Sequence, residues 1–251
     1  MADVQIRIRD LIKRYGKIDA LKGFTFETSG DWGCLGVLGR NGAGKTTLLR
    51  ALVGMLPFDS GILEVEVDGK KWSHADPRTT VFIAERQTLA ESLTGWQHLR
   101  VYEGLNALID VAVDADLRMK LIEGFGLEEH LDKPVSKMSK GTRRKVELVA
   151  AVSSEVPLVV ADELAEGVDV PSMYAFEKVI REGVAGGKHF IVSSHNVGFL
   201  SEACDVLAVV DEGRCVDTFR LTRGESNIKE RVLAAFGCFS EDQTEEIKSK
   251  G

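Results

Sequence analysis

A glycine-rich loop constrains the fold of this chain more than any other stretch of its sequence. The loop consists of Gly39, Arg40, Asn41, Gly42, Ala43, Gly44, Lys45, Thr46 and Thr47, in the pattern G-x-x-x-x-G-K-[ST]. The apolar run 34–38 before it predicts a strand, and the periodic run 48–53 after it predicts a helix. Backbone N–H groups in such a loop can surround a phosphate, and the positive end of the following helix faces the same anion. The stretch therefore predicts a nucleotide-binding site.

Two side chains at the end of the loop have expected roles. Lys45 would reach the β- and γ-phosphates as a point charge, and the Thr46 hydroxyl would coordinate Mg²⁺. A chance match in a glycine-containing turn is the alternative, and the flanking strand and helix patterns argue against it.

Composition indicates a globular protein. The 251 residues are 44% hydrophobic and 28% charged, with a net charge of −7. This charge argues against a general electrostatic grip on nucleic acid, so no nucleic-acid partner is expected. The start, Met1 to Val4, lacks the features of a secretory signal, and no apolar run is long enough to span a membrane. We expect a cytoplasmic protein; if a membrane is involved, another chain would supply the membrane-spanning part.

The cysteines carry no metal or disulfide pattern. They are scattered and lack C-x-x-C spacing, at Cys34, Cys204, Cys215 and Cys238. Buried free thiols in a reducing compartment are therefore expected.

Strand and helix patterns alternate as in an α/β fold. Strands are predicted at 4–9, from 24 onward, at 62–67 before an Asp68-Gly69 hairpin turn, and at 80–84. Apolar runs at 157–161, 190–193 and 206–210 predict parallel strands covered on both faces. A helical pattern fills the middle and ends in a helix at 142–152, and a further helix is predicted at 228–236.

These patterns divide the chain into four parts. Residues 1–86 and 157–220 are expected to form two parts of a nucleotide-binding core, which includes an antiparallel β element. Residues 87–156 form an inserted α-helical subdomain, and residues 221–251 form a C-terminal helix and an acidic, polar tail. The predicted class is α/β.

Two carboxylates end the apolar strand before 162. At the carboxyl edge of a parallel sheet, Asp162 could hold Mg²⁺ through a water and Glu163 could polarise the water that attacks a γ-phosphate. A solvated acidic turn is the alternative. His195 ends a strand expected beside that of Asp162, which favours a γ-phosphate contact over a purely structural histidine.

In this order of motifs the chain resembles the ATP-binding cassette (ABC) ATPases over nearly its whole length, which implies a P-loop NTPase (RecA-like) core that uses ATP and Mg²⁺. Gly39 to Thr46 match the Walker A loop, Glu163 the catalytic glutamate, and His195 the switch histidine. Residues 57–61 match the turn after the first helix, and 167–169 match the D-loop. Tyr15 matches the aromatic A-loop, although an aromatic beside a glycine is more often packing or turn chemistry.

Ser139, Lys140 and Gly141 stand where the family has its signature motif, at the start of a helix. A hydroxyl and free N–H groups at that helix end can form a second phosphate site. In the family this site completes the nucleotide site of the opposite subunit. The resemblance therefore implies a homodimer or heterodimer of cassettes, with a separate transmembrane permease subunit.

The chain also departs from the family pattern. Glu85 replaces the glutamine of the family's Q-loop. A carboxylate can still coordinate a metal ion but cannot donate a hydrogen bond, and Gln87 is a weak substitute for the missing glutamine. Lys140 replaces a signature glycine, and Leu164-Ala165 replace the usual Pro-Thr after Glu163. Residues 143–145 are interpreted as a solvated basic helix face, from which one side chain could assist the phosphate.

The resemblance implies an ATP-hydrolysing subunit that powers transport by a separate membrane protein. The signature and the Q-loop glutamate are more similar to bacterial exporters than to importers, so we expect export, at the cytoplasmic face of a membrane. The alternative is a soluble ABC ATPase that drives assembly or remodelling of a protein partner. A guanine-specific enzyme is disfavoured because no Asn-Lys-x-Asp motif follows the core strands.

Overall fold

The computed structural model describes residues 2–28, 31–86, 89–222 and 227–237. Its strands are β1 (Val4–Tyr15), β2 (Ile18–Glu27), β3 (Cys34–Gly39), β4 (Ser60–Val67), β5 (Lys70–Trp72), β6 (Thr80–Ile83), β7 (Leu158–Ala161), β8 (His189–Ser194), β9 (Val206–Asp211) and β10 (Arg214–Arg220). Its helices are α1 (Lys45–Leu52), α2 (Gly95–Ala107), α3 (Ala115–Gly124), the 3₁₀ helix η1 (Val135–Lys137), α4 (Lys140–Ser153), α5 (Val170–Ala185), α6 (Val197–Ala203) and α7 (Ile228–Ala235). The predicted α/β class is confirmed.

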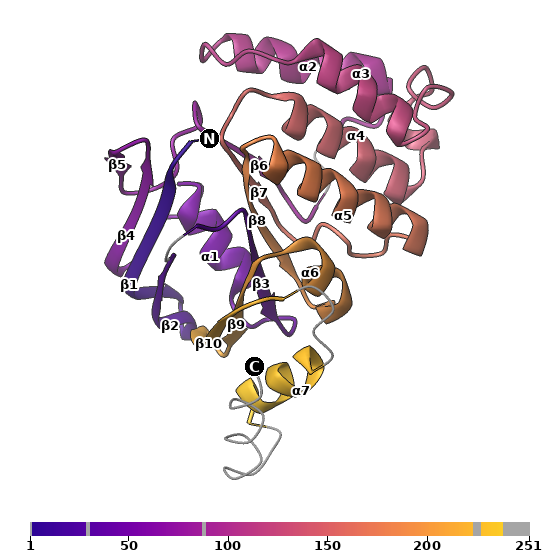
Figure 1. The fold of residues 1–251 in the computed structure, drawn as a ribbon. Helices are drawn as coiled ribbons and strands as arrows, with labels where there is room; N and C mark the ends of the chain where they lie inside the picture. Colours follow the sequence, from indigo (N-terminus) through magenta and orange to yellow (C-terminus); the bar gives the residue numbers. More distant parts are fainter. Residues whose placement is uncertain (1, 29–30, 87–88, 223–226, 238–251) are drawn as a thin grey trace.

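A mostly parallel sheet forms the centre of the molecule (Figure 1). Its strand order within the described residues is β10-β9-β3-β8-β7-β6, and only β10 runs antiparallel to its neighbour. The strands β3, β7 and β8 therefore end at the same edge. Because the loop at 39–47, the carboxylates at 162–163 and His195 each follow one of these strands, the topology brings them together.

Both faces of this sheet are buried. Leu158 and Val160 of β7 pack with α1, whereas Val159 and Ala161 of the same strand pack with α4, α5 and α6 on the opposite face. This alternation follows from the period of two along a strand. The near-continuous apolar runs at 157–161, 190–193 and 206–210 thus correspond to the parallel strands β7, β8 and β9, which are covered on both faces of the sheet, as predicted.

An antiparallel sheet in the order β2-β1-β4-β5 covers the other side of α1 (Figure 1). Asp68 and Gly69 join β4 to β5 with φ of 50° and 77°, the left-handed conformation that a tight hairpin turn requires. The predicted antiparallel β element is confirmed.

Some boundaries differ from the sequence-based expectation. The strand β1 continues past Arg9 to Tyr15 because Asp10, at φ 48°, allows an irregular register there without ending the strand. The strand β2 begins at Ile18, before the expected start at 24. The helix α1 ends at Leu52, earlier than expected, because Gly54 follows with φ 72° as a C-terminal glycine.

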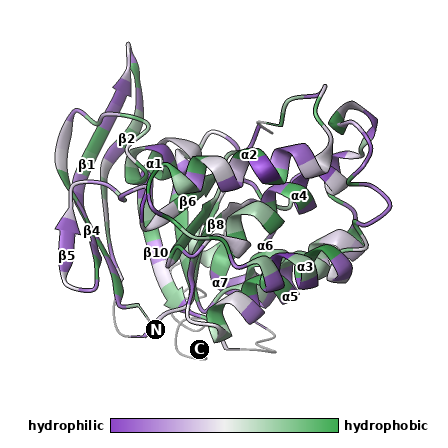
Figure 2. Ribbon diagram, turned by 90° about the horizontal axis from the view of Figure 1, so that it is seen from above, coloured by the Kyte–Doolittle hydropathy of each residue, from purple (hydrophilic) through white to green (hydrophobic). Residues whose placement is uncertain are grey.

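Helices α2, α3 and α4 lie in the predicted helical region (Figure 1), and Figure 2 shows hydrophilic and hydrophobic residues along each of them. The helices α5 and α6 and the strand β10 were not predicted. The helix expected at 228–236 is confirmed as α7. The polar tail beyond 237 lies outside the described residues, and the domain division at 86, 156 and 220 stays a prediction.

The described cysteines are free thiols. Cys34 and Cys204 are buried with their Sγ atoms 3.3 Å apart, and Cys215 is half-buried. Burial raises the pKa of the Cys34 thiol well above its usual range, and the contact with Cys204 adds to this. Cys238 lies outside the described residues.

Candidate functional site

A cavity of about 400 Å³ lies at the sheet edge where β3 and β7 end. It is lined by Ile18, Asp19, Ala20, Asn41, Gly42, Gly44, Lys45, Thr46, Thr47, Glu85, Glu163 and Glu166. The predicted phosphate loop, the carboxylate after β7 and Glu85 thus come from three separate parts of the chain to one hollow. Its volume is in the range of small-molecule and cofactor sites.

The loop keeps its curved shape because of glycine. Gly44 has φ 107°, and a Cβ at this position would lie 2.7 Å from the carbonyl oxygen of Ala20. The helix α1 begins at the next residue, Lys45, so its unpaired N–H groups open toward the cavity. This arrangement is suited to an anion.

Lys45 is the buried cation of the site. Its Nζ donates to the carbonyl oxygens of Gly39 (2.8 Å) and Arg40 (3.1 Å) and forms an ion pair with Glu163 Oε1 at 2.8 Å. Only 5% of Lys45 is exposed. An anionic ligand in the cavity would therefore compete with Glu163 for this ammonium group.

Glu163 lies between two basic side chains. Its Oε2 lies 3.1 Å from Nδ1 of His195, while its Oε1 contacts Lys45. The strand of His195, β8, pairs with β7, as the sequence predicted. The backbone of Glu163 has φ 47°, an unusual conformation for this residue type that costs energy and that the surrounding contacts must maintain.

A buried serine holds the two carboxylate residues in place. Ser193 donates its hydroxyl to Asp162 Oδ1 at 2.6 Å and accepts the backbone N–H of Glu163 at 2.9 Å. Sequence reasoning missed this residue. The sequence carried no local signal for it, because Asp162 and Ser193 come together through the parallel register that opposes Ala161 with Val192.

Asp162 meets one requirement of a divalent cation site. It is fully buried, and its Oδ2 has no hydrogen-bond partner among the described residues. Thr46 and Glu85 line the adjoining cavity with oxygen atoms. Mg²⁺ prefers oxygen ligands and usually keeps waters and phosphate oxygens beside one or two protein groups. The few oxygen donors of Thr46, Glu85 and Asp162 fit such a partly hydrated, phosphate-bound Mg²⁺. Among the described residues there is no cluster of three or more His, Cys, Asp or Glu that could hold a metal ion.

Some predicted site residues lie outside the cavity. The lining does not include Gly39, Arg40 or Ala43, and the Arg40 guanidinium lies 5.4 Å from the ring of Phe236 beyond α7. Tyr15 is 46% exposed at the end of β1, under the ammonium of Lys13, and also lies outside the lining. Gln87 falls outside the described residues.

The predicted signature residues are likewise separate from the cavity. Ser139 caps α4 by accepting the N–H of Thr142, and Ser139 and Lys140 are exposed. Lys140 Nζ lies 3.6 Å from Glu166, a cavity-lining carboxylate. One chain thus presents the loop and the signature residues at different places.

The interpretation of 143–145 as a solvated basic face is wrong for Arg144. This side chain is fully buried, and its guanidinium contacts Glu147 and the carbonyl oxygens of Ala84 and Glu85. Sequence alone could not show this, because Arg144 points to the strand end after β6, about 60 residues earlier in the chain.

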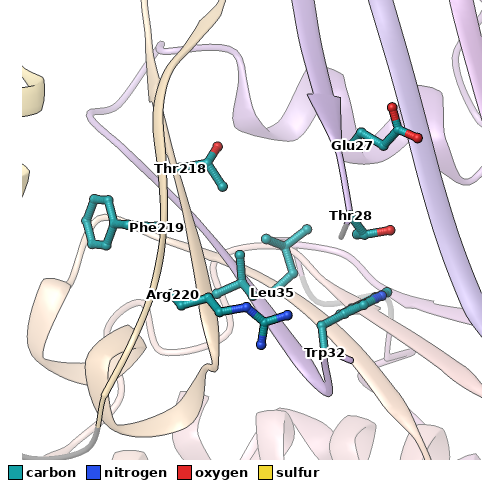
Figure 3. A pocket seen from close by; sticks show the side chains of 8 residues that line it. Glu27, Thr28, Trp32, Leu35, Thr218, Phe219 and Arg220 are labelled. Carbon is teal, nitrogen blue, oxygen red and sulfur yellow. The ribbon is translucent and has the colours of Figure 1, made fainter. Parts of the chain in front are cut away.

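A second hollow of about 120 Å³ opens between β2, β3 and β10 (Figure 3). Glu27, Thr28, Trp32, Leu35 and Arg220 are among its lining residues. It contains none of the predicted site residues. The cavity-lining residues that the sequence predicted all belong to the larger cavity.

Many known proteins are similar to this chain in sequence. The family described as "ABC transporter" matches residues 24–166. The Nod factor export ATP-binding protein I of Ralstonia nicotianae is 30% identical over 242 residues, spanning 93% of this chain and 70% of the relative. A daunorubicin resistance ATP-binding protein of Streptomyces coeruleorubidus is 32% identical, over 86% of this chain and 68% of its own. A ribose import ATP-binding protein of Bacillus licheniformis is 25% identical over 87% of this chain, which spans 45% of that relative.

Solved structures show the same fold. The ATP-binding subunit of an ABC transporter superposes with a TM-score of 0.72 at 24% identity, covering 97% of this chain and 99% of that one. A dimeric bacterial ABC transporter cassette gives 0.72 at 19% identity, covering 86% and 99%. No helix among the described residues has the length and apolar character needed to cross a membrane.

Proposed function

The chain belongs to the ABC transporter family, and from that membership we propose that it is the ATP-hydrolysing subunit of an exporter with a separate membrane-spanning partner. The observation that carries the proposal is the contact of Glu163 with both Lys45 and His195, where Lys45 and Glu163 line the glycine-loop cavity. This arrangement combines a phosphate-binding cation with a carboxylate able to accept a proton.

The contacts support a defined role for each residue. A bound γ-phosphate would give Lys45 new acceptor oxygens, so the ammonium group would release Glu163 Oε1. The freed carboxylate would then accept a proton from the water that attacks the γ-phosphorus, as the bond to ADP breaks. His195, already hydrogen-bonded to Glu163 Oε2, would contact the transferred phosphate.

Thr46, Asp162 and Glu85 are the residues that would hold Mg²⁺, whose chemistry there is to neutralise charge on the phosphate oxygens. The buried and unpaired Oδ2 of Asp162 supports this assignment. Ser193 binds the other oxygen, Oδ1, of the same carboxylate, so Oδ2 is the oxygen without a partner among the described residues.

The position of the signature residues supports a two-chain site. Ser139, which is exposed, and Gly141, which is buried, lie at the start of α4 and do not line the cavity of their own chain, so we propose that this helix start contacts ATP bound to a second cassette. A single chain would then bind ATP and hydrolyse it poorly. Homodimer and heterodimer are both compatible with this geometry.

The direction of transport rests on resemblance. The relatives named for export and drug resistance are 30% and 32% identical to this chain, whereas the ribose importer is 25% identical. These values support export at the cytoplasmic face of a membrane. The transported compound would contact the membrane partner.

Size-exclusion chromatography of Glu163→Gln with MgATP tests the ATP site and the dimer. The amide keeps the shape of Glu163 but cannot accept the proton, so ATP should persist and hold two chains together. The control is Lys45→Ala in the same background, which should remain monomeric. A Glu163→Gln protein that stays monomeric and hydrolyses ATP at the normal rate would contradict the proposal.

Co-purification tests the membrane partner. The tagged protein, expressed in its native host and extracted in mild detergent, should retain a polytopic membrane protein. Recovery with a water-soluble protein complex and no membrane protein would instead favour an ATPase that drives assembly or remodelling.

A further inference from the structure

Arg144 is a buried cation that the proposed reaction does not use. It lies in the second turn of α4 with no exposed surface. Its Nη1 donates to the carbonyl oxygen of Ala84 at 2.6 Å and to Glu147 Oε2 at 2.9 Å, and its Nη2 donates to the carbonyl oxygen of Glu85 at 2.7 Å. One guanidinium group therefore joins the helix that begins at the signature residues to the segment that enters the nucleotide cavity.

We propose that Arg144 is a positioning residue that holds Glu85 at the nucleotide site. The proposal rests on the function proposed above, because it assigns Glu85 to the Mg²⁺ of bound ATP. Glu85 lines the cavity together with Glu163 and Lys45, so the backbone that Arg144 holds carries a cavity side chain.

The chemistry of the contact requires arginine. Ala84 and Glu85 follow the last residue of β6, Ile83, so strand pairing no longer supplies donors to their carbonyl oxygens. A planar guanidinium presents several N–H groups in a fixed fork and can serve two successive carbonyls together with a carboxylate. A lysine ammonium carries its three donors on one atom and cannot span the same acceptors.

The ion pair with Glu147 favours a positional role over a stabilising one. Glu147 is only 4% exposed, so both charges are removed from water. Buried ion pairs are often no more stabilising than apolar side chains of similar volume, since desolvation offsets their attraction. What this pair adds is a fixed direction for the guanidinium, toward the strand end after β6.

The test measures how ATP binding depends on Mg²⁺ in Arg144→Lys. We expect unchanged affinity for a fluorescent ATP analogue in EDTA and a rise of about tenfold in the Mg²⁺ concentration that half-saturates binding, within the range of coupling between contacting residues. The matched control is Arg118→Lys, which alters an ion pair with Glu103 in the same helical region, away from the cavity. An unchanged Mg²⁺ requirement in Arg144→Lys would overturn the proposal.

A double-mutant cycle with Glu85→Ala separates positioning from general damage. If Arg144 acts through Glu85, the Arg144→Lys change should raise the Mg²⁺ requirement no further once Glu85→Ala is present. Effects that multiply would show that Arg144 acts elsewhere, which also overturns the proposal.

Folding is checked by thermal unfolding of each variant. If Arg144→Lys does not fold, Glu147→Gln provides the test, since it leaves the guanidinium intact and removes its anionic partner; the Mg²⁺ requirement should rise in the same direction, and an unchanged value refutes the idea. Failure of the proposed function itself is distinguishable, because the unmodified protein would then fail to bind ATP.

Discussion

Replacing Ser193 with alanine removes one hydroxyl that contacts both Asp162 and Glu163. Ser193 is fully buried, and it donates to Asp162 Oδ1 at 2.6 Å while accepting the N–H of Glu163 at 2.9 Å. After the substitution, both carboxylate oxygens of Asp162 lack a described partner, because Oδ2 already has none. The unusual backbone conformation of Glu163, with φ 47°, loses this contact as well.

The expected loss of stability follows from these two hydrogen bonds. A bond to a charged group contributes about 1.5–3 kcal/mol, and a buried N–H left without an acceptor costs about 1–3 kcal/mol. We therefore expect the free energy of unfolding to fall by about 3 kcal/mol. For a chain of this size, such a loss lowers the melting temperature by roughly 6–12 °C.

The matched control is Ser194→Ala. Ser194 is the next residue on β8 and is also buried, but within the described part of the chain its hydroxyl has a single hydrogen bond, accepted from the N–H of Asn196 at 3.0 Å. Asn196 is exposed, so water can replace this contact, and we expect a loss of about 1 kcal/mol or less.

Differential scanning calorimetry measures stability, and a phosphate-release assay measures ATP hydrolysis. Ser193→Ala should lose both stability and turnover, whereas Ser194→Ala should keep near-normal turnover. Equal effects of the two substitutions on stability and on turnover would refute the assignment of Ser193 as the support of the carboxylates.

Three further outcomes are expected. Lys45→Ala should weaken ATP binding by at least about 30-fold in calorimetric titration, because truncating one side of a buried charge contact costs about 2–5 kcal/mol; unchanged affinity would contradict the loop assignment. Gly104→Ala should raise the free energy of unfolding by about 0.5–1 kcal/mol, since Gly104 lies inside α2 with open space around a Cβ; a destabilised protein would show that the space is not free. In a variant lacking the other two cysteines, Cys34 and Cys204 should react slowly with a thiol reagent at pH 8, since burial raises the pKa of Cys34, and rapidly in denaturant; rapid labelling of the native protein would contradict their burial.

Most strands of the fold could be predicted because their patterns are local. The apolar runs of β3, β7, β8 and β9 and the Asp68-Gly69 turn each depend on a few neighbouring residues. The strand β10 escaped prediction because its burial does not follow its residue types: Val216 is exposed while Asp217 is half-buried, and the strand is specified mainly by pairing with β9. The helix α5 carries its own start signal, an Asp169 side chain that accepts the N–H of Ser172, and this signal was overlooked.

The candidate site was only partly predictable. Motif spacing identified Lys45, Asp162, Glu163 and His195, since each follows a strand in a parallel sheet. The ion pair between Lys45 and Glu163 joins residues more than a hundred positions apart, and no local pattern specifies which partner a lysine chooses.

The sequence by itself determined the family, the α/β class and the residue types at the phosphate loop, because glycine conformations, apolar periodicity and motif order are properties of short segments. Only the tertiary structure decided that Arg144 is buried and that Ser193 supports Asp162. The physical reason is that burial and hydrogen-bond partners depend on which distant segments pack together. A basic residue on a helix looks solvated until the strand end that it contacts is known.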